Sequence, residues 1–429
     1  MKRKYILTFT AFLSLMLFLN VSLVSAAEDG QWIPRSDLPE PRSGSAIAQV
    51  GGQIYIFGGT GTSNHSYEGA KTNTTYKYDT LTDTWTKLKS MPTTRSGVTA
   101  AVYEHKIYVT GGYYDGANGV ARTNKLEIYD TTTDTWTSGA NMPTARSWAS
   151  AEIIGSKIYV IGGTGSNNNL LSTVESYDIE LNKWNIEKSA PVIVNGVKTA
   201  TYNNEIYTFG GQTALGYENI IKTIYKYTPS INSWTTVTTL PAPVNAPGIV
   251  VFENKVYILG GTTRDGGKTT NVTVFDPSNN SFESFPNLTV PRAQNMCAVV
   301  DGKLFVIGGT DGKQILKSVE MFALVSNEPQ QPGEPQQPEE PQQPELPSGN
   351  RAILVITLDT GLEKEFDLSM EEVNAFITWY ENKQAGTGTA SYAIDKHDNN
   401  KGPFSARKDY VIFDKILTFE VNEYNISNE

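Results

Sequence analysis

The chain of 429 residues is long enough for two or three domains. Its formal net charge is -10 and no basic stripe offsets this acidity, so we exclude nucleic acid and anionic membranes as partners. Cys297 is the only cysteine, which excludes an intrachain disulfide; exported bacterial proteins often lack disulfides, whereas small extracellular animal domains usually need them.

Residues 1–26 have the composition of a secretory signal peptide. The basic stretch MKRK precedes an apolar run, and Val24, Ser25 and Ala26 supply small residues for cleavage. We expect cleavage after Ala26 and therefore a secreted or cell-surface protein without membrane insertion after cleavage. An uncleaved membrane anchor is the alternative. No cysteine follows the apolar run, which excludes lipid attachment there.

One short motif recurs six times along the chain. It reads KIYVTGG at Lys106, and its glycine pairs begin at Gly58, Gly111, Gly162, Gly210, Gly260 and Gly308. The copies lie about 50 residues apart, which indicates a repeat architecture. Each copy is rich in β-branched and aromatic residues and therefore predicts a strand packed on both faces, which the glycines end.

A second landmark sets the register of the repeat. An aromatic residue lies 26 positions before every glycine pair, at Trp32, Trp85, Trp136, Trp184, Trp234 and Phe282. Five of these six follow another aromatic residue by seven positions, and the segment between them (DTLTDT in the first repeat) is a turn former. The spacing predicts a four-stranded antiparallel unit of strands a, b, c and d, with strand a innermost and strand d outermost.

Six such units in a row resemble kelch repeats, and about residues 30–325 resemble a six-bladed β-propeller. The resemblance implies an all-β domain over residues 27–326. The last repeat lacks an outer aromatic strand, whereas the segment GQWIPRSDLP around Trp32 has one without a repeat of its own. We therefore expect the N-terminal segment to complete the sixth blade, so that no sheet edge is left unpaired.

A linker and a second domain follow the repeats. Proline occupies every third position from Pro329 to Pro347, which favours a stiff polyproline II spacer over residues 327–350. Residues 351–429 then read as a small α+β domain without an assigned role. Its strands are AILVITL, KEFDL and YVIFDKILTFEV, the last being one long or two short strands. Ser369 and Glu372 form a capping box for a helix that ends near Lys383.

The b–c loops and the d–a connections share one face of such a propeller, and all length variation between repeats lies there. We call this the loop face and expect it to bind the ligand. Four blades begin strand a with an arginine, at Arg42, Arg95, Arg146 and Arg292. Two interpretations are open: a partial ring of guanidinium groups that grips a carboxylate at the pore mouth, or a structural residue that binds loop carbonyls in each repeat. Val194 and Val244 replace the arginine in blades four and five.

Other candidates lie on the inner strands and the b–c loops. Trp148 stands where the other blades have smaller side chains, and it is either a stacking platform for a sugar or a residue that fills the channel. Glu152 and Lys198 are neighbours in adjacent blades and are expected to pair. The loop candidates are Tyr67, Glu68, Tyr113, Tyr114, Asp115, Asn168, Tyr217, Glu218, Arg264 and Asp265.

Most enzyme classes lack their residues. The histidines His65, His105 and His397 are scattered, which excludes the copper site of a kelch-class radical oxidase, and no zinc spacing, nucleophile elbow or phosphate-binding loop is present. We therefore predict neither a metal nor a cofactor. Some exported six-bladed kelch proteins are similar to sialic acid mutarotases. For such an epimerase, Glu218 and one arginine of the ring would supply the acid/base group and the substrate-binding cation.

The sequence thus favours non-catalytic extracellular recognition of a carbohydrate or a protein through the loop face. A carbohydrate-active enzyme such as a mutarotase-like epimerase is the first alternative, and a structural or adhesive surface protein is the second. The fold resemblance alone does not choose between them, because propellers host many unrelated functions.

Overall fold

The computed structural model describes residues 30–61, 69–117, 119–214, 216–324, 350–358, 363–384, 389–395 and 408–425. The chain divides into two compact units, Met1–Pro329 and Gln330–Glu429. The expected signal peptide, nearly all of the expected linker, and the loop candidates Tyr67 and Glu68 lie outside the described residues. Within the described ranges, no helix has both the length and the apolar composition needed to cross a membrane.

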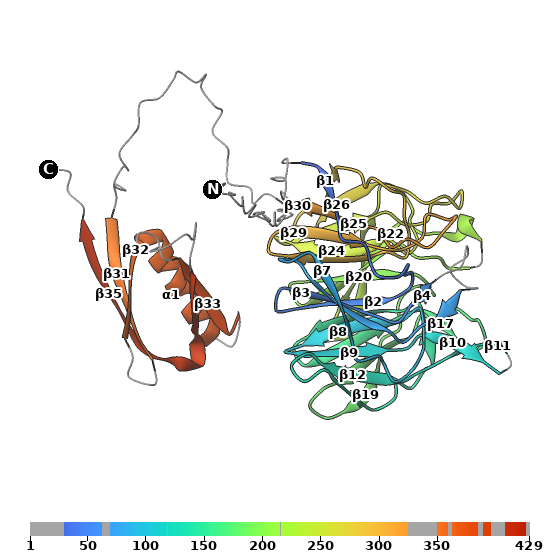
Figure 1. Cartoon of the computed structure of the whole chain (residues 1–429), viewed down its shortest axis with the longest axis horizontal. Coiled ribbons are helices and arrows are strands. Elements are labelled where there is room, and N and C mark those ends of the chain that lie inside the picture. Colours follow the sequence, from blue (N-terminus) through green and yellow to red (C-terminus); the bar gives the residue numbers. More distant parts are fainter. Residues whose placement is uncertain are drawn as a thin grey trace, which may run out of the picture. The chain divides into compact units, whose positions relative to one another are not determined.

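The first unit consists of six four-stranded antiparallel sheets (Figure 1). Strand a of the six blades is β2 (Ala46–Val50), β8 (Thr99–Tyr103), β15 (Ser150–Ile154), β20 (Lys198–Tyr202), β24 (Gly248–Phe252) and β28 (Met296–Val300). Strand b is β3 (Gln53–Phe57), β9 (Lys106–Thr110), β16 (Lys157–Ile161), β21 (Glu205–Phe209), β25 (Lys255–Leu259) and β29 (Lys303–Ile307). Strand c is β6 (Thr75–Asp79), β12 (Leu126–Asp130), β18 (Val174–Asp178), β22 (Thr223–Thr228), β26 (Val272–Asp276) and β30 (Val319–Ala323). Strand d is β7 (Thr84–Leu88), β13 (Thr135–Ser138), β19 (Lys183–Glu187), β23 (Ser233–Thr239), β27 (Ser281–Phe285) and, for the sixth blade, β1 (Trp32–Arg35).

The sheets close into a ring, which confirms the six-bladed propeller and its N-terminal closure. Each inner strand lies beside the inner strands of both neighbouring blades. Strand β1 pairs with β30, and Trp32 lies opposite Phe322 in that register. The Trp32 indole also donates to the carbonyl of Pro286 at 3.0 Å, which ties the closing strand to the fifth blade.

The same indole contact explains why an aromatic residue recurs in strand d. The outer-strand tryptophan of each of blades one to four donates its Nε1–H to a carbonyl of the preceding blade's d–a connection. These bonds are Trp85 to Ser36 (2.9 Å), Trp136 to Lys89 (2.9 Å), Trp184 to Ala140 (2.7 Å) and Trp234 to Lys188 (2.9 Å). The outer strands are therefore joined from blade to blade, and the ring is held at its circumference as well as at its centre.

The glycine pair after strand b is required by a close approach between blades. Gly111 has φ of 67°, and a Cβ added to it would lie 2.6 Å from the carbonyl oxygen of Arg146 in the next blade. Only glycine combines this backbone conformation with that approach.

Short strands and turns project from the loop face, where Figure 1 shows β4, β10, β11 and β17 at one end of the propeller. Three small ladders occur there: β4 (Thr60–Gly61) with β5 (Ala70–Lys71), β10 (Tyr113–Gly116) with β11 (Gly119–Arg122), and β14 (Arg146–Ser147) with β17 (Thr164–Gly165). The 3₁₀ turn η1 (Tyr217–Asn219) lies in the b–c loop of blade four, and η2 (Pro229–Ile231) lies in the c–d turn of that blade.

The second unit is a small α+β domain, as expected. Its sheet has β31 (Asn350–Leu358) between β32 (Glu363–Ser369) and β35 (Ile416–Asn425), and α1 (Met370–Gln384) packs against it. The backbone N–H of Glu372 donates to Ser369 Oγ at 3.3 Å and that of Ser369 donates to Glu372 Oε2 at 2.9 Å, which confirms the capping box. The last segment forms two strands, β34 (Lys408–Ile412) and β35, separated by η3 (Phe413–Lys415), and β34 pairs with β33 (Ser391–Asp395).

Candidate functional site

The four arginines lie four positions before strand a begins and are buried, so the interpretation that they form a ligand-binding ring at the pore mouth is wrong. Arg95, Arg146 and Arg292 are 0% exposed and Arg42 is 2% exposed. Arg146 Nη1 donates to the carbonyls of Gly162 at 3.0 Å and Thr173 at 2.9 Å. Arg95 and Arg292 make the equivalent bonds in their blades, which confirms the alternative that the arginine binds loop carbonyls in the repeat.

Each of these arginines also has a glutamate of its own. The ion pairs are Arg95 with Glu127 (2.9 Å), Arg146 with Glu175 (2.8 Å), Arg292 with Glu320, and Arg42 with Glu40. Burial lowers the pKa of the Arg146 guanidinium, and the charge of Glu175 acts in the opposite direction. In blades two, three and six the guanidinium charge is neutralised inside the blade, whereas Glu40, the partner of Arg42, is 48% exposed. The pair expected for a mutarotase, Glu218 with an arginine of the ring, is therefore not assembled.

The channel mouth on the loop face is formed by six backbone positions, which we call the pore rim. These residues, two positions before the first residue of strand a, all have φ between 49° and 67°: Gly44, Gly97, Trp148, Gly196, Ala246 and Gln294. The N–H of each rim residue from the second blade to the sixth donates to the carbonyl of the preceding rim residue, at 2.8 to 3.2 Å. The left-handed conformation thus serves a chain of hydrogen bonds that runs around the mouth from blade to blade.

Trp148 covers part of this mouth. Its ring packs on that of Tyr113, with centroids 5.9 Å apart and an interplanar angle of 33°. A Cβ at Gly44 would lie 2.8 Å from the ring, and one at Gly97 would lie 3.2 Å from it, so the ring extends over two neighbouring blades. A void of about 20 Å³ lies between this ring and the neighbouring rim residues, at the loop-face end of the channel. This geometry fits the interpretation that Trp148 fills the channel. Tyr113 is 2% exposed and supports Trp148, so the prediction that Tyr113 contacts a ligand is wrong.

The other described loop candidates differ in exposure. Tyr217 is 49% exposed, Glu218 and Asn168 are exposed, and Tyr114 is half-buried. Asp115 pairs with Lys71 at 2.8 Å and joins the loops of blades one and two. Arg264 donates to the carbonyl of Ile220 at 2.9 and 3.0 Å and so holds the turn that carries Tyr217. Asp265 accepts from the neighbouring Thr263 hydroxyl, within its own loop.

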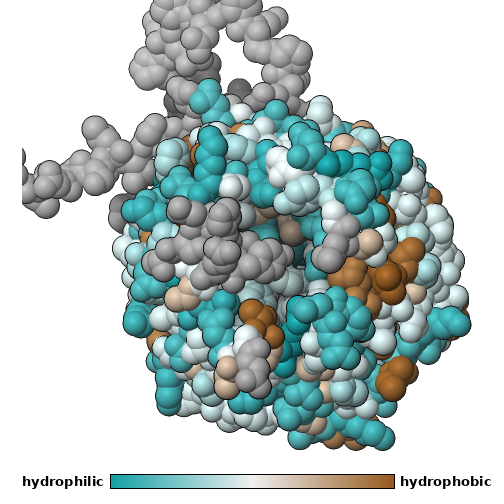
Figure 2. Space-filling model, turned by 90° about the vertical axis from the view of Figure 1, so that its right-hand side faces the viewer, coloured by the Kyte–Doolittle hydropathy of each residue, from teal (hydrophilic) through white to brown (hydrophobic). Residues whose placement is uncertain are grey.

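The sequence pattern does not point to two apolar residues that are exposed on the loop face. Val120, at the start of β11, is 52% exposed, and Ile193, in the d–a connection before blade four, is 46% exposed. Neither has a signal in the repeat pattern, because both lie where the repeats differ. Figure 2 views this face: it is largely hydrophilic, is hollowed at its centre and carries separate hydrophobic patches.

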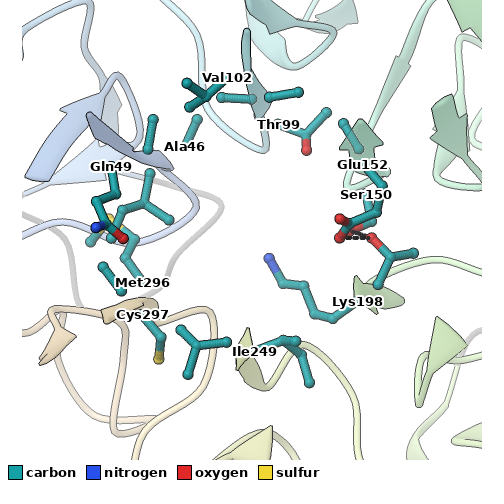
Figure 3. A pocket seen from close by; sticks show the side chains of 18 of the residues that line it. Ala46, Gln49, Thr99, Val102, Ser150, Glu152, Lys198, Ile249, Met296 and Cys297 are labelled. Carbon is teal, nitrogen blue, oxygen red and sulfur yellow. Dashed lines mark hydrogen bonds between the residues drawn. The ribbon is translucent and has the colours of Figure 1, made fainter. Parts of the chain in front are cut away.

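Below the pore rim lies a central channel with a volume of about 350 Å³ (Figure 3). It is open because small side chains line it, among them Ala46, Ala48, Ala100, Ala101, Ala151 and Ala298. Its far end, at the a–b turns, reaches solvent, since Gln49 is exposed and Val251 is 39% exposed there. The channel is therefore open on the face opposite the loops and covered by Trp148 at the loop face.

The two channel charges do not pair, contrary to the prediction. Glu152 accepts hydrogen bonds from Thr199 Oγ1 at 2.8 Å and Thr201 Oγ1 at 2.9 Å. Lys198 and Ser150 each follow the rim residue of their blade by two positions, so Lys198 lies level with Ser150 and not with Glu152. The Lys198 side chain extends into the channel (Figure 3). Burial raises the pKa of Glu152 and lowers the pKa of Lys198.

The channel also contains the single cysteine. Burial raises the pKa of the Cys297 thiol to about 12, which keeps it protonated and unreactive at neutral pH. In the part of the chain that the structure describes, no three His, Cys, Asp or Glu side chains gather as metal ligands.

The family model described as the Attractin/LZTR1 β-propeller matches residues 54–319, more than half of the chain. The chain belongs to this β-propeller family. The solved structure described as "Structure of YjhT" covers 68% of this chain and 98% of its own, with a TM-score of 0.59 and 17% identity, which supports the propeller fold.

Relatives with kelch names confirm the kelch type of this family member. Kelch-like protein 25 of Xenopus tropicalis is 29% identical over 42% of this chain, Kelch-like protein terF of Aspergillus terreus is 32% identical over 43%, and Alpha-scruin of Limulus polyphemus is 34% identical over 33%. The matching segments span 31%, 41% and 16% of those proteins, so the likeness covers less than half of each.

Proposed function

We propose that this protein is an exported, non-catalytic recognition protein whose propeller binds a protein partner through the loop face. The repeat type supports a binding role, because kelch propellers typically act by binding other proteins. The rigid ring beneath and the variable loops above give a surface of the kind that binding proteins use.

The observation that carries the proposal is the location of exposed apolar side chains on the loop face. Val120, Ile193 and Tyr217 come from three different loops and are 46 to 52% exposed. Tyrosine is enriched among the residues that contribute most of the binding free energy in protein interfaces, and apolar neighbours around it help to exclude water. The loop face around them is largely hydrophilic (Figure 2).

Secretion or attachment at the cell surface forms part of the same proposal. The basic, apolar and small-residue segments of residues 1–26 support export. An exported protein with a core as large as that of a propeller can be stable without disulfides, which fits the single cysteine of this chain. Expression of the full chain in a bacterial host, with mass spectrometry of the mature N-terminus, tests this part. A mature chain that begins at Ala27 supports export, and retention of Met1 in the cytoplasm contradicts it.

Binding is tested by capture from surface and secreted proteins of the source organism with three forms of the full chain. These are the parent, a loop-face variant (Val120→Asp with Tyr217→Ala), and the control variant Leu181→Asp, which changes an exposed residue of a c–d turn on the opposite face. We expect a partner that the parent and the control retain and the loop-face variant loses. A partner retained equally by all three forms would overturn the assignment of the surface.

A carbohydrate ligand is the second candidate, and the geometry of Tyr217 favours it. A Cβ at Gly266 would lie 2.6 Å from this ring and Lys268 Nζ lies 5.8 Å from its centroid, so the ring is held in place while 49% of the residue is exposed. A fixed aromatic face can stack on the apolar face of a sugar. Binding to a glycan array that Tyr217→Ala abolishes, without protein capture, would replace the protein partner by a glycan.

A further inference from the structure

The central channel contains a cation that lacks a counter-charge. Lys198 lines both the 350 Å³ channel and the small void under Trp148, and its amino group points into the open space (Figure 3). Across the described residues, no carboxylate forms an ion pair with this amine. A lysine enclosed in this way is costly unless an anion accompanies it or it loses its proton.

The acidic group of the channel is held away from Lys198 by hydrogen bonds. Thr199 and Thr201 both donate to the Glu152 carboxylate, and Ser150 Oγ lies 2.7 Å from Thr199 Oγ1. The Glu152 carboxylate therefore has its hydrogen-bond partners within the channel wall. The Lys198 amine, in contrast, can interact with a molecule that occupies the channel. Cys297, the other titratable group of the lining, is a protonated thiol and supplies no charge.

We propose that the channel is a second binding site, for a small hydroxylated monocarboxylate that reaches it from the a–b face and bonds to Lys198. A single lysine matches a single negative charge, whereas a dianion such as phosphate would place excess charge near Glu152. Hydroxyl groups of the occupant find partners along the lining, where Gln49, Thr99 and Asn295 add polar atoms. This site is independent of the proposed recognition through the loop face.

The shape of the channel decides the direction of access. The void between Trp148 and the inner strands has a volume of about 20 Å³, which is roughly enough for one water molecule. The opposite end is bordered by the exposed Gln49 and by Val251. A six-carbon sugar acid thus passes through the a–b face and stops beneath the rim.

The test is calorimetric titration of the full chain with gluconate, glycolate and sorbitol, the last being the uncharged analogue of gluconate. We expect saturable binding of one gluconate or glycolate per chain, and sorbitol binding at least about tenfold weaker, since a charge-assisted hydrogen bond is lost. Equal affinity for gluconate and sorbitol, or no saturation with either carboxylate, overturns the proposal without requiring any variant.

Variants then locate the site. Lys198→Gln should weaken gluconate binding about tenfold to a hundredfold, while Lys183→Gln, which removes an exposed lysine of β19, should leave it unchanged. Glu152→Gln should strengthen binding by removing a like charge from the channel. Tyr217→Ala should change loop-face capture and leave gluconate binding intact, so failure of either function is distinguishable from failure of the other. Undiminished binding by a folded Lys198→Gln would place the carboxylate elsewhere.

Discussion

Removal of either partner of a buried arginine–glutamate pair should destabilise the propeller, and replacement of both should cost less than the sum of the two single losses. In blade three, Arg146 is 0% exposed and Glu175 is 2% exposed, and their charged atoms are 2.8 Å apart. Glu175→Thr leaves a buried guanidinium without a counter-charge. Arg146→Val leaves a buried carboxylate and removes the donor of two carbonyls. Each single substitution should therefore lower the free energy of unfolding by about 3–5 kcal/mol.

The double variant Arg146→Val with Glu175→Thr copies a solution that the chain already uses. Blade five has Val244 at the position of the arginine and Thr273 at that of the glutamate. Because the second substitution removes the charge that the first leaves unpaired, the loss in the double variant should be smaller than the sum of the single losses by about 1–3 kcal/mol.

Urea unfolding followed by tryptophan fluorescence measures these free energies. The signal reports chiefly on the propeller, because Trp379 is the only tryptophan of the second unit. The exposed pair Lys255–Glu283 is a matched control, and Glu283→Thr should cost about 0–1 kcal/mol. Additivity of the two single losses within about 0.5 kcal/mol would show that Glu175 is not the charge partner of Arg146.

Three further predictions concern closure, the pore rim and the channel charge. Deletion of residues 29–39 removes Trp32 and the outer strand of blade six, so the melting temperature should fall sharply; a deletion variant as stable as the parent would refute the closure. Trp148→Gly should be more stable to urea than Trp148→Ala by about 1–2 kcal/mol, because only glycine adopts a φ of 57° without strain; an alanine variant of equal stability would contradict this. Since burial raises the folded-state pKa of Glu152, its charge lowers stability as the pH rises above the unfolded value of about 4.3. Glu152→Gln should therefore stabilise the protein at pH 8 and hardly at all at pH 4, and a gain that is equal at both pH values would refute the effect.

The architecture was accessible from the sequence because it depends on spacing. The constant interval between the outer-strand aromatic and the glycine pair reflects two fixed contacts, the indole bond to the preceding blade and the close approach at residues such as Gly111. The closure by β1 followed from the strand that the sixth repeat lacks. Such spacings can be read from the sequence alone, because they do not depend on how the side chains are oriented.

The role of the arginines was less accessible, although the sequence contains a signal for it. A glutamate lies two positions before the strand-c position of Tyr129, Tyr177 and Phe322 in blades two, three and six, all of which have the arginine. Blades four and five have Tyr225 and Thr273 there and valine in place of the arginine. Blade one departs from the pattern, since it has Arg42 but Tyr76 at the glutamate position, and Arg42 pairs with Glu40. The co-occurrence in the other five blades indicates a charge pair, whereas the arginine positions alone do not distinguish a pair from a ligand site.

The channel was the part that strand patterns could not specify. Glu152 and Lys198 are close in the repeat alignment, but a difference of two positions along a strand is about 6–7 Å, enough to replace an ion pair by bonds to threonine hydroxyls. The course of the Trp148 ring over Gly97 and Gly44 depends on its side-chain direction and on the space that glycine leaves in two other blades.

The pore rim separates the two proposed binding regions physically. Its hydrogen bonds of 2.8 to 3.2 Å run from blade to blade, and the Trp148 ring covers part of the mouth between the loop face and the channel. A change in a loop should therefore not reach the channel. The losses in free energy of unfolding for Tyr217→Ala and Lys198→Gln should add within about 0.5 kcal/mol in the double variant. A larger deviation would mean that the rim transmits changes from one region to the other, and the two sites would then have to be treated as one.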